Sequence, residues 1–73
     1  MNEKNLLSFH KTLKRLRLDS NMTQKQAAEK IGISYQSYQA YEIGITLPTL
    51  SHFTKLCEIF ETTPNELLGF SDI

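Results

Sequence analysis

The sequence predicts an all-α fold made of five short helices. Three observations lead to this prediction. Apolar residues recur every three or four positions, as on one face of a helix, and no segment shows the apolar-polar alternation of a strand. Hydroxyl side chains that can cap a helix precede four of the apolar segments, at Thr23, Ser34, Thr49 and Thr63. A chain of 73 residues forms at most one small domain with a modest core.

The first helix is expected over residues 5–19. Its buried face would carry apolar side chains spaced by three, four and three positions: Leu6, Phe9, Leu13 and Leu16. Lys11, Lys14 and Arg15 fall mostly on other faces, where we expect them to attract a polyanion only at long range. The helix should end near Ser20 and Asn21, because asparagine tolerates the left-handed conformation that closes helices.

The second helix is expected over residues 24–31. Thr23 precedes it, and its hydroxyl can accept a hydrogen bond from the first turn while Gln26, three residues later, reaches back. This spacing is typical of a capping box. Gly32 can adopt a positive φ angle and therefore permits a tight turn into the next helix.

The third helix is expected over residues 35–43, between a Ser34 cap and an end at Gly44. Tyr38 and Tyr41 should face inward. The other side chains near the start of this helix should then lie on its outer surface. Two helices joined by a glycine turn form a compact corner, so residues 23–44 are predicted to be a helix-turn-helix unit.

Thr49 can cap a fourth helix that follows Pro48. Its inward side chains should be Leu50, Phe53, Leu56, Cys57 and Phe60. Thr63, Pro64 and Glu66 then occupy the cap, first and third positions of a short fifth helix that ends at Gly69. Residues 70–73 should form a flexible tail, and the core should span about residues 5–69.

Composition narrows the function. The net charge is zero, but residues 1–30 carry seven basic against three acidic side chains and residues 31–73 carry one against five, or +4 and −4. The lone Cys57 cannot form an internal disulfide, and His10 and His52 are expected in surface or packing roles. We expect no catalytic site, no cofactor, no metal ion and no small-molecule substrate. The sequence lacks a membrane-length apolar run and a signal-peptide layout, which predicts a cytoplasmic protein.

The chain resembles the Cro/C1-type, or XRE-like, helix-turn-helix domains of phage repressors and bacterial regulators over about residues 9–68. The residues that carry the resemblance are Thr23, Gln24, Ala28, Gly32, Ser34, Tyr38, Glu42, Gly44 and Pro48, followed by residues 64–68. It implies a compact five-helix lambda-repressor-like fold. It also implies a regulator that binds double-stranded DNA by placing the third helix in the major groove.

The resemblance implies base contacts from the outer surface of the third helix, by Tyr35, Gln36, Gln39 and Ala40. Gln36 is the strongest candidate, because a glutamine amide can donate and accept together against the edge of adenine. In the alternative interpretation Gln36 and Gln39 are ordinary solvated amides, and Tyr35 covers the neighbouring helix.

Phosphate contact or positioning roles are expected for a second set of residues: Arg17, Thr23, Gln24, Lys25, Ser34, Ser37 and Thr46. Arg17 and Glu42 match a family pair that would anchor the first helix to the third and aim Arg17 towards phosphate. A purely structural ion pair is the alternative.

Some positions depart from the family pattern. Ala27 stands where leucine is usual, and Tyr38 and Tyr41 replace aliphatic residues, so we expect the rings to fill the vacated volume and their hydroxyls to reach solvent or a polar partner. The third helix has no Lys or Arg, and Ile45 and Leu47 occupy a loop that is often basic. A monomer should therefore bind DNA weakly.

Weak monomer binding favours a homodimer on a near-palindromic operator. Candidate dimer residues are Ile45, Leu47, Leu68, Phe70 and Ile73, unless these apolar groups close the monomer core. The alternative function is a protein-interaction module, anti-repressor or antitoxin-like, that keeps the helix-turn-helix fold. The neutral net charge favours this alternative.

Overall fold

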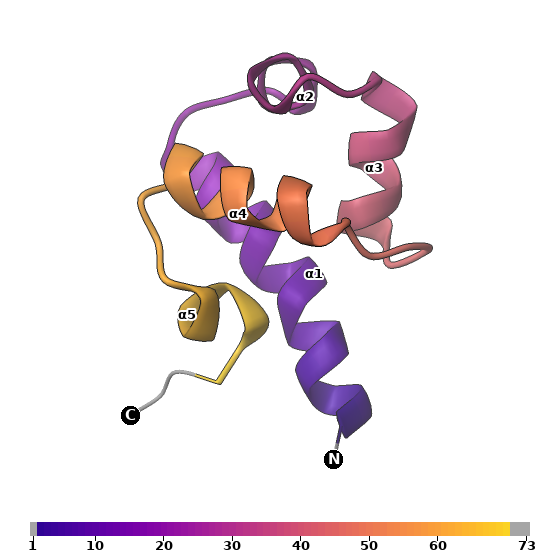
Figure 1. The fold of residues 1–73 in the computed structure, drawn as a ribbon, viewed down its shortest axis with the longest axis vertical. Coiled ribbons are helices and arrows are strands. Elements are labelled where there is room, and N and C mark those ends of the chain that lie inside the picture. Colours follow the sequence, from indigo (N-terminus) through magenta and orange to yellow (C-terminus); the bar gives the residue numbers. More distant parts are fainter. Residues whose placement is uncertain (1, 71–73) are drawn as a thin grey trace.

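The computed structural model describes the backbone of residues 2–70 and the side chains of residues 8–70. These residues form helices and no strand, in the order α1 (Asn2–Asp19), α2 (Gln24–Ile31), α3 (Tyr35–Ile43), α4 (Leu50–Ile59) and α5 (Pro64–Leu68) (Figure 1). The all-α prediction is confirmed, and α1 begins three residues earlier than expected. The predictions for the Leu6 side chain and for residues 71–73 lie outside the described residues.

The helix ends follow the predicted local signals. The Thr23 hydroxyl accepts from the Gln26 amide at 3.0 Å, and Gln26 Oε1 accepts from the Thr23 amide at 2.8 Å, so the capping box is complete. Gly32 has a φ of 89°, which makes the turn between α2 and α3 possible without the strain that a Cβ atom would bring. Asn21 closes α1 with a φ of 58°, as predicted.

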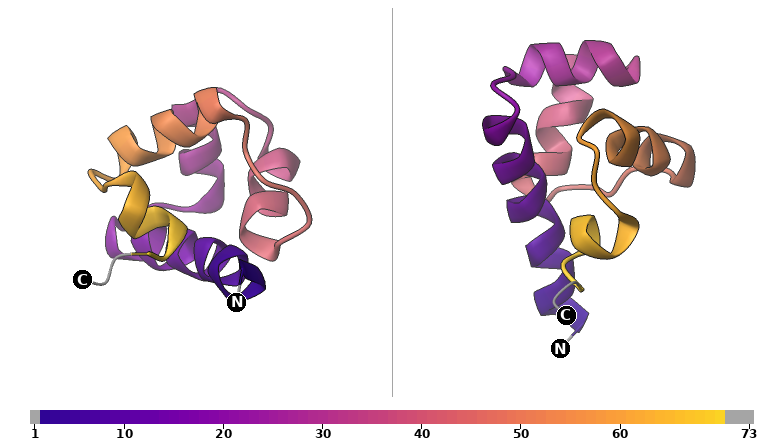
Figure 2. Two further views of the ribbon diagram at one scale, coloured as in Figure 1. Left: turned by 60° about the horizontal axis from the view of Figure 1, so that its bottom comes forward. Right: turned by 90° about the vertical axis from the view of Figure 1, so that its left-hand side faces the viewer.

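The long α1 runs along one side of the molecule and packs against both α3 and α5, while α2 packs against α3 and α4 (Figures 1 and 2). The core lies between them and contains Phe9, Leu13, Ala27, Ala28, Ile31, Tyr38, Tyr41, Leu56, Phe60 and Leu67. None of the helices in the described part of the chain has the length and apolar character needed to cross a bilayer.

One core prediction is wrong, because Leu50 is 81% exposed. It lies at the edge of the apolar stripe of α4 and in the first turn, where no preceding turn shields it. Leu56 and Phe60 are buried as expected, and Phe53 and Cys57 are half-buried. Leu50 instead borders a shallow apolar hollow together with Phe9, Leu47, Pro48, Phe53 and Leu68.

Candidate nucleic-acid interface

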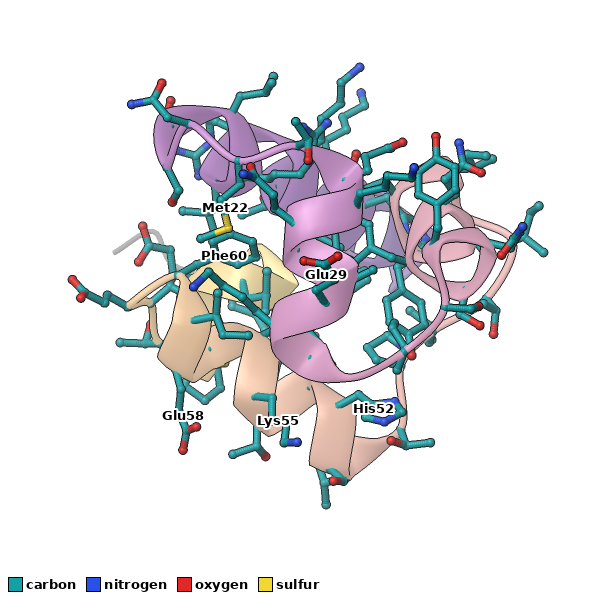
Figure 3. The ribbon with its side chains drawn as sticks, turned by 90° about the horizontal axis from the view of Figure 1, so that it is seen from above. Met22, Glu29, His52, Lys55, Glu58 and Phe60 are labelled. Atoms are coloured by element: carbon teal, nitrogen blue, oxygen red, sulfur yellow. The ribbon has the colours of Figure 1, made fainter. Side chains whose placement is uncertain are left out.

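The start and outer surface of α3 face away from the core at the periphery of the molecule (Figures 1 and 3). Ser34 caps this helix by accepting from the Ser37 amide at 3.0 Å. Tyr35 is 37% exposed, Gln36 and Ser37 are exposed, and Gln39 and Ala40 are half-buried. The prediction that Tyr38 and Tyr41 face inward is confirmed.

A carboxylate beneath this surface joins three helices. The Glu42 side chain on α3 is only 3% exposed, and its Oε2 lies 2.7 Å from Arg17 Nε on α1. Arg17 Nη2 lies 3.2 Å from the other oxygen, Oε1, which also accepts from Gln24 Nε2 on α2 at 3.0 Å. The Tyr38 hydroxyl donates to Oε2 at 2.6 Å. Four donors therefore satisfy the buried carboxylate, as a buried charge requires.

These contacts determine the charge state of the cluster. Burial alone would raise the pKa of Glu42, but the hydrogen bonds from Arg17, Tyr38 and Gln24 outweigh it and hold that pKa below its ordinary value. Burial, together with the Glu42 carboxylate, raises the pKa of the Tyr38 hydroxyl. Tyr38 therefore stays protonated and donates to an ionised Glu42.

Arg17 is 8% exposed, and a third donor, Nη1, binds the Met22 carbonyl at 2.9 Å. The predicted pairing of Arg17 with Glu42 is present in the structure. With its guanidinium buried and engaged in this way, Arg17 is suited to positioning α3 rather than to direct contact with a phosphate.

Two further contacts connect the cluster to the surface of α3. Gln39 Nε2 lies 3.4 Å from Gln24 Oε1 and 3.1 Å from the Tyr35 hydroxyl oxygen. A continuous series of polar contacts therefore runs from buried Glu42 through Gln24 and Gln39 to Tyr35. These residues were all candidates from the sequence, but the contacts among them were not predicted.

α1 holds α3 at a second point. His10 Nδ1 lies within hydrogen-bonding distance of the Tyr41 carbonyl oxygen, and it must donate because a carbonyl only accepts. The His10 ring also packs beside Gly44, where an added Cβ would come within 3.3 Å of it. The Tyr41 hydroxyl also lies 3.2 Å from Nδ1 of His52, a residue in the first turn of α4 (Figure 3). Both tyrosine hydroxyls thus have polar partners, as predicted.

The structure gathers most of the predicted contact residues into two hollows beside α3. The first is lined in part by Gln36, Ser37, Ala40 and Thr46. The second is lined in part by Arg17, Thr23, Gln24, Lys25 and Tyr35. Ser34 and Gln39 lie outside both. Thr49 and His52 also line the first hollow, although neither was predicted to contact DNA.

Two helices joined by a glycine turn, with the second one capped and presented at the surface, define a protein of the helix-turn-helix class. A family model described as helix-turn-helix matches residues 13–67, so the chain belongs to this family. The resemblance to Cro/C1-type domains is thereby confirmed.

The chain is similar to several curated regulators. It is 45% identical over 49 residues to the cryptic phage CTXphi transcriptional repressor RstR of Vibrio cholerae, covering 67% of this chain and 44% of that protein. It is 37% identical over 57 residues to the transcriptional regulator AnsR of Bacillus subtilis, covering 78% and 49%. The SPbeta prophage-derived regulator YonR of Bacillus subtilis is 37% identical over 60 residues, covering 82% and 56%.

The chain thus spans about half the length of these curated relatives. No solved structure was found to match it.

Proposed function

We propose that this chain is a sequence-specific regulator of transcription that binds double-stranded DNA, a small Cro/C1-like repressor acting in the cytoplasm. The observation that carries the proposal is the outer surface of α3, a capped helix that presents amides and a phenol and is anchored from below by Glu42. The similarity to a transcriptional repressor over 67% of the chain supports it.

In this proposal α3 enters the major groove of the DNA. Base contacts come from Tyr35, Gln36, Gln39 and Ala40. Phosphate contacts come from residues in and beside the two hollows, namely Thr23, Gln24, Lys25, Ser34, Ser37 and Thr46. Arg17 acts through Glu42 as a positioning residue.

The Gln36→Ala variant tests the proposal. A duplex is first selected by the native chain from a random pool, and the affinity of both proteins for it is then measured. We expect the variant to bind about 5- to 150-fold more weakly, because a glutamine amide that pairs with adenine contributes about 1–3 kcal/mol of discrimination. Thr54→Ala, a neutral change on the exposed face of α4, should leave affinity unchanged. If the native chain binds no duplex in the pool even at low salt, the function is wrong.

We further propose that the regulator binds as a homodimer on a near-palindromic operator. Ile45, Leu47, Leu50 and Phe70 are exposed apolar side chains, and Leu47 and Leu50 border the hollow that also includes Phe53. Exposed Leu47 and Leu50 beside recessed Phe53 suit a two-fold contact, in which each copy offers both a protruding and a recessed apolar group. A single α3 has no Lys or Arg to contact phosphates, and a dimer would double the number of phosphate contacts made by the other residues.

Sedimentation equilibrium with Leu50→Glu tests the dimer. A buried charge without a partner is unfavourable, so the variant should sediment as a monomer at concentrations where the native chain is dimeric. Leu18→Glu is the matched control, because Leu18 is also exposed but lies on α1 outside this hollow. A native chain that is monomeric at every concentration would contradict the homodimer.

A protein-interaction module is the second candidate, favoured by the neutral net charge and by the absence of Lys and Arg from α3. The same selection separates the two functions, because an interaction module would retain no duplex.

A further inference from the structure

The polar contacts that lead out of the buried cluster have a fixed direction. The ionised Glu42 carboxylate can only accept hydrogen bonds, so the Gln24 group that faces it at 3.0 Å must be the NH₂ group. The carbonyl oxygen of the same amide is thereby turned towards α3. An inverted Gln24 would place its oxygen against a carboxylate oxygen and leave a buried acceptor without a donor.

The same reasoning fixes the next amide. Gln39 meets the carbonyl oxygen of Gln24 at 3.4 Å, so Gln39 must also present its NH₂ group. The Tyr35 hydroxyl oxygen lies 3.1 Å from that nitrogen. Because an amide NH₂ group has only two hydrogens, both are used inside the protein. Gln39 retains one free group, the acceptor Oε1, and the Tyr35 hydroxyl keeps its own hydrogen to donate.

Gln36 differs from Gln39 in this respect. Among the described residues its side chain makes no hydrogen bond, and it is exposed. Its amide can turn either way and can engage a base with both of its groups. The two glutamines on one helix therefore offer DNA different chemistry, although their side chains are identical.

We propose that Gln39 determines specificity as an acceptor only: it recognises the amino group of a base in the major groove, N6 of adenine or N4 of cytosine, and cannot read the acceptors N7, O6 or O4. Gln24 is the positioning residue that enforces this orientation. The inference rests on the proposed DNA-binding function and deepens it, because it assigns the chemical group that one side chain reads.

Base analogues test the inference. Gln39→Ala, measured on single-base variants of the selected duplex, first locates the base pair that Gln39 reads. Two analogues at this pair are then compared, one that lacks the amino group (purine for adenine, or 2-pyrimidinone for cytosine) and one in which the purine N7 is replaced by C–H. For the native chain we expect loss of the amino group to weaken binding about three- to ten-fold, the usual effect of one hydrogen bond, and loss of N7 to have no effect. Gln39→Ala should be insensitive to both changes.

Gln24→Met provides the second arm. This variant removes the carbonyl that holds the Gln39 amide, so the amide of Gln39 can turn over. The ratio to measure is the loss of binding caused by removing the amino group divided by the loss caused by removing N7. We expect this ratio to be lower for Gln24→Met than for the native chain. A change in overall affinity alone would not alter this ratio. The inference is overturned if the native chain depends on N7 rather than on the amino group, if Gln39→Ala changes no base preference, or if Gln24→Met leaves the ratio as in the native chain. In each of these cases a duplex still binds, which distinguishes them from failure of the proposed function.

Discussion

Replacing Glu42 with alanine is expected to lower the free energy of unfolding by about 3–5 kcal/mol, the usual effect of removing one partner from a buried ion pair. The variant leaves the Arg17 guanidinium buried without a counterion and deprives the Tyr38 hydroxyl and the Gln24 amide of their acceptor. Because small domains are stable by only about 5–15 kcal/mol, the loss is a large fraction of the total. Urea denaturation followed by circular dichroism measures it.

Two controls separate the buried pair from a general effect of losing a carboxylate. Glu58→Ala removes an exposed glutamate from α4 and should change stability by less than about 0.5 kcal/mol. Combining Arg17→Met with Glu42→Leu removes both charges and should recover the part of the loss that comes from the unpaired Arg17, but not the part that comes from the Tyr38 and Gln24 donors, which still lack their acceptor. A loss below about 1 kcal/mol for Glu42→Ala would show that Arg17 finds other partners or water, and would contradict the proposed anchoring of α3.

Truncating Leu13 to alanine is expected to cost about 2–5 kcal/mol, through lost burial and the cavity left behind. Leu13 has no exposed surface and lies on the face of α1 that packs into the core. Leu18→Ala is the matched control, since it makes the same change in the same helix at a side chain that is 53% exposed. Thermal and urea denaturation should show a large shift for the first variant and a shift within about 0.5 kcal/mol for the second.

A small loss of stability in both leucine variants would contradict the packing of α1 described above. A large effect for both would instead indicate that Leu18 is covered by another part of the protein or by a second copy.

Apart from the start of α1, the helix boundaries could be predicted from the sequence because their causes are local. The Thr23 and Gln26 pair lies within one turn, and Gly32 acts on its own backbone. Burial at the edge of a stripe could not be predicted in the same way. Leu50 has the spacing of an inward residue, but its exposure depends on where α4 begins and on which other helices reach that first turn.

In the candidate site, too, local features could be predicted from the sequence and contacts between helices could not. The 3.6-residue period separates the inward Tyr38 and Tyr41 from the outer surface of α3, but it does not distinguish the exposed Gln36 from the half-buried Gln39. The pairing of Arg17 with Glu42, 25 positions apart, followed only from the family resemblance. The orientations of Gln24 and Gln39 depend on which groups meet in space, and neither periodicity nor spacing contains that information. The i, i+4 spacing of Tyr38 and Glu42 was the one local signal for a polar cluster here.

The two attachments of α3 to α1 also have a consequence for the DNA. His10 and Arg17 lie seven residues, or about two turns, apart on one face of α1, and they engage the Tyr41 carbonyl and the Glu42 carboxylate. A helix held at two such points resists rotation about its own axis. When the major groove does not fit α3 in this orientation, the DNA must therefore bend or twist, because the helix cannot turn. Sequences that deform at low cost would then be favoured, including base pairs that no side chain touches. Part of the operator preference would thus reside in the flexibility of the DNA.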